Sequence, residues 1–575
     1  MNLRRMNQET TPRTNPRTRT DLLLLAAFCG FLFFYGLGAF GLLGADEPRY
    51  AQIAREMLDR SAWITPTLGG KPWLEKPPLY YWQAMLSFRL TGVSDRAARL
   101  PAALDAALLV SAVYFFLRRF RPGSELDGAL IAASCVGVIG FAHAAATDMP
   151  LAACFAIALL AWYAWYETRR QIDLAAFYIF LALGTLAKGP VAPALAAVII
   201  LLFIVVKRDW LTIPRTLWIP GIALYLAVTL PWYIAVQLRN PEFFRVFILE
   251  HNLARFSTGV YHHPQPFWFF LPVFLLAMMP WAFALILAVA ERGRLIWSEG
   301  KQAFSSPEDS WPLFLLLWMF VPILFFSASQ SKLPGYILPA VPAGALLVAE
   351  YLAAHASTNT ASANAKSADL SPDETSRDGS SPHRSSRNKS RLSPLFAAAH
   401  GVLCGLLVFA ALSAASVATN HHLLRGTATW VAAGIAAVFA LAISVALLSR
   451  AGLSLLSRLT ALAVVISVAV VIRLAAPVID ATQSARPIAR SIQSFSRETV
   501  PIALYHVNRV QEYGLEFYLN RPAQSYDNGN IPSASHVLVA AQGTQLKVAQ
   551  LVPGRRVSYL TSVPQQKLDL YWVEK

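Results

Sequence analysis

The chain has 575 residues, of which 55% are hydrophobic and only 14% are charged, and its mean hydropathy is +0.45. A soluble protein carries about 25% charged residues, so this composition excludes an ordinary soluble enzyme and predicts a multi-span membrane protein. The formal net charge is +16, but Lys and Arg accumulate in the cytoplasmic loops of membrane proteins. We therefore expect membrane lipids, and no nucleic acid, as partners.

The N-terminus predicts a retained first span. Basic residues precede an apolar run from Leu22, and no small-residue cleavage site occurs before the chain turns polar near Gly44. The cysteines offer neither a disulfide framework nor metal-site spacing, because all of them lie in apolar segments: Cys29, Cys135, Cys154 and Cys404.

Apolar windows long enough to cross a bilayer predict an α-helical polytopic domain over residues 21–478, after a cytoplasmic segment 1–20. We expect thirteen spans, near 21–43, 100–117, 126–142, 150–166, 174–187, 190–206, 217–236, 267–289, 311–328, 336–353, 394–418, 429–448 and 459–476. Lys and Arg are concentrated in the segments on the N-terminal side, which predicts a cytoplasmic N-terminus and a C-terminus on the opposite face. The short loops of that opposite face carry few basic residues: Lys188, Arg239, Arg245, Arg255, Lys332 and Arg425.

Two regions break the apolar pattern. Residues 354–393 contain almost no large apolar side chains, which predicts a disordered cytoplasmic loop. Residues 479–575 alternate short apolar and polar runs, which predicts a small α/β domain on the outer face. We expect a helix over 487–495, and strands over 502–507, 515–519, 536–541, 557–560 and 568–573.

The first outer loop, residues 44–99, begins with a predicted amphipathic helix. Pro48 suits a first helical turn. The apolar side chains that follow recur with helical spacing, which is typical of a helix lying on the membrane surface: Tyr50, Ile53, Ala54, Met57 and Leu58.

Acidic and basic residues of this loop are candidates for catalysis or for binding a substrate. Asp46 and Glu47 stand where the span ends, either as helix-capping acids or as carboxylates that face a cleft. Glu75 and Lys76 precede Pro77–Pro78, which holds them in extended backbone. Lys76 is either an anchor to lipid headgroups or a phosphate ligand.

Further ionisable residues emerge on the same side under this topology: Asp148, Lys188, Glu250, His251, Arg255 and Lys332. A channel or pump more typically carries its acids inside the spans. A ring of charges at one face instead favours chemistry on a lipid headgroup. A His beside an acid is a minimal metal pair, although adjacency in sequence is weak support for coordination.

Six ordered motifs resemble those of bacterial polyprenyl-phosphate-sugar glycosyltransferases, above all the aminoarabinose lipid A transferases of the protein O-mannosyltransferase superfamily. They are ADEPRYA (45–51), LEKPPLYYW (74–82), TDMP (147–150), AKGP (187–190), EHNLARF (250–256) and SKLPGYILPA (331–340). The resemblance implies a C-type glycosyltransferase fold with thirteen spans in a bacterial inner membrane. It also implies an outer-face α/β domain and transfer from an undecaprenyl-phosphate sugar with inversion at the anomeric carbon.

The resemblance also assigns roles to residues. Asp46, Glu47 and Asp148 become the candidate catalytic acids, and the donor phosphate would contact Lys76, Lys188, Arg255 and Lys332. Tyr80, Tyr81 and Tyr336 would line a lipid cavity, whereas Glu75 and His251 match a proposed zinc-binding pair.

Three alternatives stay open at this point. The acceptor is lipid A, receiving 4-amino-4-deoxy-L-arabinose, or it is a protein or another glycan. A polyprenyl-lipid transporter would need charged or broken helices deep in the spans, of which the sequence indicates few. The tail domain has either a structural role or a role in acceptor recognition.

Overall fold

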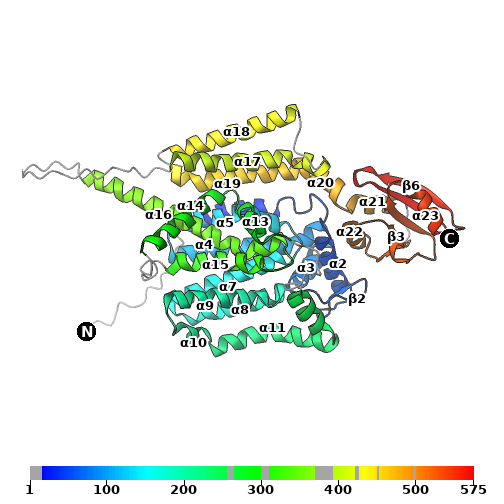
Figure 1. The fold of residues 1–575 in the computed structure, drawn as a ribbon, viewed down its shortest axis with the longest axis horizontal. Coiled ribbons are helices and arrows are strands. Elements are labelled where there is room, and N and C mark those ends of the chain that lie inside the picture. The colour runs from blue at the N-terminus through cyan, green and yellow to red at the C-terminus, as the bar shows by residue number, and fades with distance from the viewer. Residues whose placement is uncertain are drawn as a thin grey trace, which may run out of the picture.

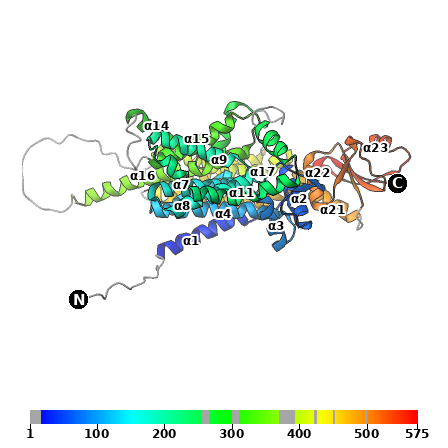
Figure 2. The same cartoon turned by 90° about the horizontal axis from the view of Figure 1, so that it is seen from below.

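The computed structural model describes residues 16–254, 265–299, 310–368, 393–420, 426–449, 452–495 and 500–575. It consists of a long helical bundle with a small α/β domain at one end (Figure 1). Helix α1 (Pro16–Cys29) begins near the opposite end of the bundle from the α/β domain (Figure 2). This architecture confirms the predicted fold class of a polytopic helical protein with a small C-terminal α/β domain.

The bundle is built from long apolar helices, because a helix satisfies its own backbone hydrogen bonds where no water is present. One layer contains α7 (Asp148–Thr168), α8 (Gln171–Lys188), α9 (Val191–Lys207) and α11 (Ile219–Arg239), with the short α10 (Thr212–Thr216) between the last two. The middle contains α4 (Asp95–Phe120), α5 (Glu125–Ser134), α6 (Val136–Ala142), α13 (Phe270–Ala277), α14 (Ala282–Glu299), α15 (Ser310–Ser327) and α16 (Val341–Ala368). The remaining layer is formed by α17 (Pro394–Asn420), α18 (Thr427–Leu448) and α19 (Gly452–Val470), as Figure 1 shows.

Within the described residues, nine helices are long and apolar enough to cross a membrane, or up to eleven when each of two bent pairs is taken as one span. Every predicted span overlaps a helix, although the helical part of the span 21–43 ends at Phe34. The helices α1 and α9 are not among the nine, and α9 is shorter than they are. The protein is therefore a multi-pass membrane protein, and the total of thirteen spans stays a prediction.

Two predicted spans are broken, which the apolar pattern did not indicate. The pair α5–α6 bends by 63° at Cys135, and residues 267–298 bend by 116° between α13 and α14. Pro280 lies in the second break, where it cannot donate a backbone hydrogen bond. The two breaks meet: the Val136 amide donates to the Met279 carbonyl at 3.0 Å, and the Trp281 indole donates to Ser134 Oγ at 2.8 Å.

The predicted disordered loop is shorter than expected. Helix α16 continues to Ala368, so the first part of the 354–393 segment is helical. This segment is rich in alanine, the residue with the highest helix propensity. The remainder of the predicted loop, from residue 369 to 392, lies outside the described residues.

The C-terminal domain is a five-stranded mixed sheet with strand order β4-β3-β5-β7-β6. Its strands are β3 (Ile502–Tyr505), β4 (Ala523–Ser525), β5 (His536–Ala541), β6 (Val557–Val563) and β7 (Leu568–Val573). β3 pairs in parallel with β4 and β5, whereas β7 pairs antiparallel with β5 and β6. The chain enters this domain from α19 through α20 (Ala476–Gln483), and the sheet packs with α21 (Arg486–Phe495), α22 and α23 (Gln545–Leu551).

The predicted strand over 515–519 is wrong, because this segment lies in α22 (Arg509–Leu519). The Asn508 side chain caps the helix by accepting from the Val510 and Gln511 amides. Gln511 and Leu515, four residues apart, are both buried, so a helical face rather than alternate residues points to the core.

The first outer loop folds against the C-terminal domain. Its helix α2 (Asp46–Asp59) is followed by the short hairpin strands β1 (Thr67–Leu68) and β2 (Lys71–Pro72) and by α3 (Leu79–Thr91). The amphipathic helix was predicted correctly, and its position along the membrane surface stays a prediction. Tyr50, Ile53 and Met57 are buried in one cluster with Tyr80 and Tyr81 of α3, so protein rather than lipid covers the apolar face.

Candidate active site

Asp46 is the first residue of α2 and the open acid of the site. Its side chain is 54% exposed, and Oδ1 accepts from Arg49 Nη2 at 2.5 Å. Ala45, not an acid, occupies the N-cap position, and no side chain forms a cap hydrogen bond. Asp46 is therefore not the capping residue of α2, and its carboxylate is exposed.

Glu47 differs from its neighbour because both of its oxygens already have partners. Oε1 accepts from Arg99 Nε and the Ala145 amide, and Oε2 accepts from Arg99 Nη2 and the Leu43 amide, at distances between 2.6 and 3.1 Å. Arg99 is fully buried. Of the two acids in the motif, Asp46 is thus available for chemistry, while Glu47 holds the surrounding loops in place.

Asp148 is the second candidate acid, and it lies at the same end of the bundle as the start of α2. Asp148 begins α7 and its Oδ1 lies 2.6 Å from Nζ of Lys188, which ends α8. The same ammonium lies 4.9 Å from the centroid of the Tyr336 ring. A Cβ on Gly335 would stand 2.3 Å from Asp148 Oδ1, so only glycine allows this approach. Three of the six motifs therefore meet here.

The loop with Glu75 and Lys76 lies beside the end of α8. Leu74 shares an apolar cluster with Leu186 of α8 and with Phe247 of the π-helical segment η2 (Phe244–Ala254). Lys76 is half-buried, and its Nζ donates to the Glu75 carbonyl at 3.2 Å.

Tyr50 is a buried tyrosine of α2 on which the charges of acids from three loops act. Burial raises the pKa of the Tyr50 phenol well above its usual range, and the nearby negative charges of Asp46, Asp148 and Glu75 raise it further, against the opposing Arg49. Sequence reasoning placed Tyr50 only in an apolar stripe. The ADEPRY motif contains Tyr50, and this was the sequence signal that could have marked it as a candidate. The same signal applies to Arg49, whose guanidinium carbon lies 5.1 Å from the centroid of the Trp73 ring.

The predicted metal pair is brought together, since His251 Nε2 lies 3.7 Å from Glu75 Oε1. A zinc site in a protein needs at least three protein ligands. No group of three suitable side chains converges within the described ranges of the chain. The residues described here do not fit a zinc site, and no step of the chemistry is assigned to a metal.

Two more residues were predicted to contact the donor phosphate, and two tyrosines to line a lipid cavity. Lys332 is buried and its Nζ donates to the Ser329 carbonyl at 2.5 Å, whereas Arg255 lies outside the described residues. Tyr80 and Tyr81 are fully buried, with ring centroids 6.0 Å apart, which favours a packing role over cavity lining.

An apolar cavity of about 630 Å³ opens beside the Gly44–Glu47 turn. Its walls come from α6, α17, α19 and the segment after α19, and its lining is apolar apart from Glu47, His143 and Ser467. None of the three predicted tyrosines lines it. The cavity thus offers an apolar chain a place next to the turn that carries Asp46.

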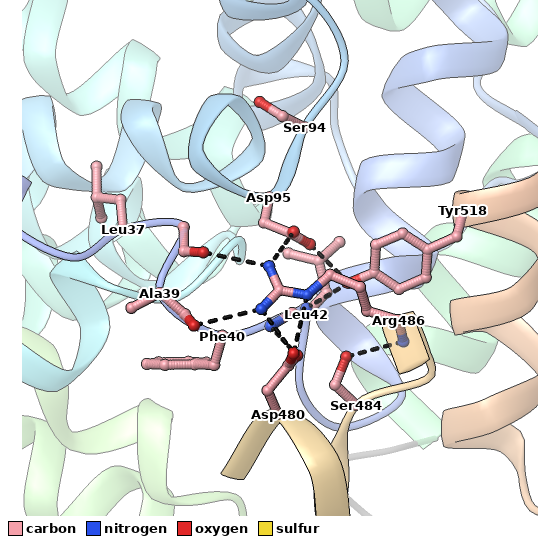
Figure 3. Close-up of polar contacts among 12 residues, drawn as sticks. Leu37, Ala39, Phe40, Leu42, Ser94, Asp95, Asp480, Ser484, Arg486 and Tyr518 are labelled. Carbon is pink, nitrogen blue, oxygen red and sulfur yellow. Dashed lines mark hydrogen bonds and ion pairs between the residues drawn. The ribbon is translucent and has the colours of Figure 1, made fainter. Parts of the chain in front are cut away.

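The C-terminal domain fixes the backbone that leads to Asp46 (Figure 3). Asp480 Oδ1 accepts from the Gly41 amide at 2.8 Å, and the Tyr518 hydroxyl accepts from the Leu42 amide at 2.8 Å. Tyr518 also donates to Asp95 at 2.6 Å, and Arg486 contacts both Asp95 and Asp480 at 2.8 to 3.1 Å. The turn is therefore held by groups far away in the sequence.

Known proteins resemble this chain in sequence. A family model described as dolichyl-phosphate-mannose-protein mannosyltransferase matches residues 75–234. An undecaprenyl phosphate-alpha-4-amino-4-deoxy-L-arabinose arabinosyl transferase from Pseudomonas savastanoi pv. phaseolicola is 34% identical over 344 residues, covering 59% of this chain and 62% of the relative. The corresponding protein of Pseudomonas aeruginosa (strain UCBPP-PA14) is 33% identical over 346 residues, covering 58% and 60%. The chain thus matches less than two thirds of the length of these relatives.

Solved structures extend the likeness to nearly the whole chain. The crystal structure of ArnT from Cupriavidus metallidurans bound to undecaprenyl phosphate has a TM-score of 0.72 and 22% identity, covering 96% of this chain and 97% of that one. Its apo structure gives a TM-score of 0.70 with 21% identity, covering 97% and 98%. The resemblance indicated by the motifs is confirmed: the chain has the fold of ArnT and is similar in sequence to aminoarabinose transferases.

Proposed function

We propose that this protein is an integral membrane glycosyltransferase that moves a sugar from undecaprenyl phosphate to lipid A or another periplasmic acceptor. The observation that carries the proposal is the meeting of three motifs at the Asp148–Lys188 pair beside Tyr336, at one end of an apolar bundle, together with the exposed Asp46 at the start of α2. The names of the curated relatives favour 4-amino-4-deoxy-L-arabinose as the sugar and undecaprenyl phosphate as the carrier.

In the proposed reaction the bond between the anomeric carbon and the lipid phosphate oxygen breaks, and a bond from the acceptor oxygen forms on the opposite face. The leaving phosphate gains negative charge, which fixed cations stabilise strongly near a low-dielectric surface. Lys76 is the candidate cation. Lys188 already contacts Asp148 at 2.6 Å, and its ammonium group has three donors, so it can contact the phosphate while it keeps this partner.

Asp46 has one of two roles, depending on the acceptor. A hydroxyl acceptor must lose its proton, and the exposed Asp46 carboxylate would then act as general base. A phosphate acceptor is already ionised at neutral pH and needs no base. In that case Asp46 and Asp148 orient the acceptor and stabilise positive charge that develops on the sugar ring.

Both substrates of such a reaction are lipids, and the apolar cavity beside Glu47 fits an alkyl or polyprenyl chain by its lining. Ligand pockets in proteins have volumes of about 300 to 1,000 Å³. We assign the inner membrane as the location, with the N-terminus cytoplasmic and residues 479–575 periplasmic. The distribution of Lys and Arg, and the position of the C-terminal domain at the end of the bundle that carries Asp46, support this orientation.

A protein or glycan O-glycosyltransferase with the same donor is the second candidate, because the matching family model is described as a protein mannosyltransferase. A transporter is the candidate from another class. It predicts broken helices, and two broken pairs occur in the described residues. One backbone hydrogen bond, from Val136 to Met279, joins the two breaks, which favours a packing role over a transport pathway.

The decisive experiment uses purified protein in detergent with an undecaprenyl-phosphate-linked sugar and lipid A. We expect sugar on lipid A by mass spectrometry, and transport cannot produce this result because detergent leaves no compartments. Lys76→Ala should abolish transfer, whereas Lys71→Ala, an exposed lysine of the same loop, should not. If lipid A stays unmodified while a peptide or glycan acceptor is modified, the second candidate holds. If no acceptor is modified, the glycosyltransferase proposal is wrong.

A further inference from the structure

A second, polar pocket lies between α2 and the C-terminal domain. Its volume is about 370 Å³, within the range of ligand pockets. One wall comes from α2 and the β1–β2 turn, and the other from the end of α22 and the residues after it, two elements that pack together in Figure 1. The lining residues are Gln52, Glu56, Asp59, Arg60, Gly69, Gly70, Glu516, Asn520, Arg521 and Pro522.

The pocket contains polar atoms that the protein does not satisfy. Gln52 is 4% exposed, and its Oε1 has no hydrogen-bond partner among the described residues. The buried Nε and Nη1 of Arg521 likewise lack partners within the described part of the chain. An unmade hydrogen bond at a buried polar atom is costly, so these atoms point to a ligand that supplies the missing groups.

The pocket is also rigid on the α2 side. Glu56 accepts from the Thr67 hydroxyl and from the Gly69 and Gly70 amides, at 2.8 to 3.1 Å. These bonds tie α2 to the hairpin that forms the rim. A preformed polar wall lowers the entropy lost when a ligand binds.

The balance of charges favours a ligand rich in hydroxyl groups. Glu56 and Asp59 oppose Arg60 and Arg521, and burial raises the pKa of Glu516 to about 7. A strongly anionic ligand would leave the two acids unpaired, and a strongly cationic ligand would leave the two arginines unpaired. No three potential metal ligands converge here or elsewhere in the described residues. A hydroxyl group both donates and accepts, so it pairs with amide and carboxylate oxygens and with guanidinium groups alike.

The pocket lies farther along α2 than Asp46. Gln52 and Glu56 lie six and ten residues beyond Asp46 on α2, or about 9 and 15 Å along the helix axis at about 1.5 Å per residue. A donor that carries one sugar has that sugar at the reaction centre and nothing beyond it. An acceptor can carry further sugar residues beyond the atom that receives the transferred sugar.

We propose that this pocket binds a sugar residue of the acceptor that lies beyond the position being modified. The proposal rests on the proposed glycosyl transfer and deepens it, because it makes the acceptor a glycan-bearing lipid. It also gives the C-terminal domain, which contributes Glu516 and Arg521, a part in acceptor recognition.

The test compares two acceptors with the same lipid A moiety, one bare and one carrying two further sugar residues. We expect Arg521→Ala to raise KM for the sugar-bearing acceptor at least tenfold, with kcat unchanged and with KM for bare lipid A unchanged. Asp59→Asn, which alters an exposed position of the pocket, should raise the same KM by a smaller factor. Arg490→Ala, an exposed arginine of α21 outside the pocket, is the matched control and should change neither KM.

A direct binding measurement separates this proposal from the proposed function. Calorimetry uses a neutral, lipid-free oligosaccharide of three hexoses, titrated into the full-length protein in detergent. Binding that Arg521→Ala abolishes supports the pocket, even if neither acceptor is modified and the proposed function fails. Equal KM changes for both acceptors, or the absence of any oligosaccharide binding to the wild type, would overturn the proposal.

Discussion

Glu47 and Arg99 form a buried ion pair that joins the start of α2 to α4 across 52 residues of sequence, with Arg99 Nη2 2.7 Å from Glu47 Oε2. Arg99 also donates to the carbonyl oxygens of Leu37, Phe40 and Gly41. One arginine thus holds the chain on both sides of the turn that presents Asp46.

We predict that Glu47→Ala destabilises the protein by about 3 to 5 kcal/mol, the usual range when one partner of a buried pair is removed. The reason is that Arg99, with no exposed surface, keeps its charge without a counterion. The loss is measured as a lower midpoint of thermal unfolding in detergent. Arg60→Ala is the control: this half-exposed residue lies 3.9 Å from Glu56 and should cost under about 1 kcal/mol. Equal stability of Glu47→Ala and wild type would show that Glu47 has no structural role.

Tyr518 connects the C-terminal domain to the same turn, so its hydroxyl should matter for both stability and activity. Tyr518→Phe leaves the Leu42 amide and Asp95 without this partner, and we expect a loss of about 1 to 3 kcal/mol. Turnover should fall as well, because the turn before Asp46 loses a support. Tyr559→Phe removes the hydroxyl of an exposed tyrosine of β6 and should be neutral in both assays. If Tyr518→Phe changes neither stability nor turnover, the C-terminal domain does not support the active site through this hydroxyl.

Gly335 should tolerate no side chain, since a Cβ there would lie 2.3 Å from Asp148 Oδ1. Gly335→Ala is expected to displace Asp148 from Lys188 and to lower turnover at least tenfold while the protein still folds. The assay is initial-rate transfer by purified protein, with size-exclusion chromatography as the test of folding. Gly434→Ala in α18 meets no atom within 4 Å and serves as the matched glycine control. Wild-type turnover in Gly335→Ala would argue against a role for the Asp148–Lys188 pair.

The raised pKa of Glu516 predicts that the stability of the protein depends on pH. Burial is the largest cause that raises its pKa, from 4.5 to about 7, and the charges of Glu512 and Glu56 add to it. The folded protein holds this proton more tightly than the unfolded chain does. The contribution of Glu516 to stability is therefore fully present below pH 4.5 and is lost as the pH rises towards about 7. Glu516→Gln should flatten this part of the profile of unfolding midpoint against pH, and an unchanged slope would contradict the assignment.

The sequence predicted the elements that depend on local pattern. Apolar windows located the long helices of the bundle, and the motifs gave Asp46, Asp148 and Lys188 as candidates without indicating that Lys188 pairs with Asp148. Contacts between distant segments could not be predicted from local sequence pattern. Glu47 and Asp46 are adjacent and chemically alike, and only the fold places Arg99 against one of them.

Two local errors have physical causes. The segment 515–519 has residues that favour strands, but the Asn508 cap and the tertiary packing of α22 override that preference. The breaks at Cys135 and near Pro280 stabilise each other through Val136 and Met279. Neither segment shows this alone, because each supplies only half of the hydrogen bond.

The most direct measurement is the mass of lipid A from a bacterial host that lacks its own aminoarabinose transferase and expresses either wild-type protein or Asp46→Asn. Asp46 is 54% exposed, and Asn preserves its size, so both proteins should reach the membrane in equal amounts. We predict lipid A that carries the added pentose with the wild type, and a loss of about 10²-fold or more in this product with Asp46→Asn. Unmodified lipid A with the wild type, or equal modification by both proteins, would contradict the proposed reaction or the central place of Asp46 in it.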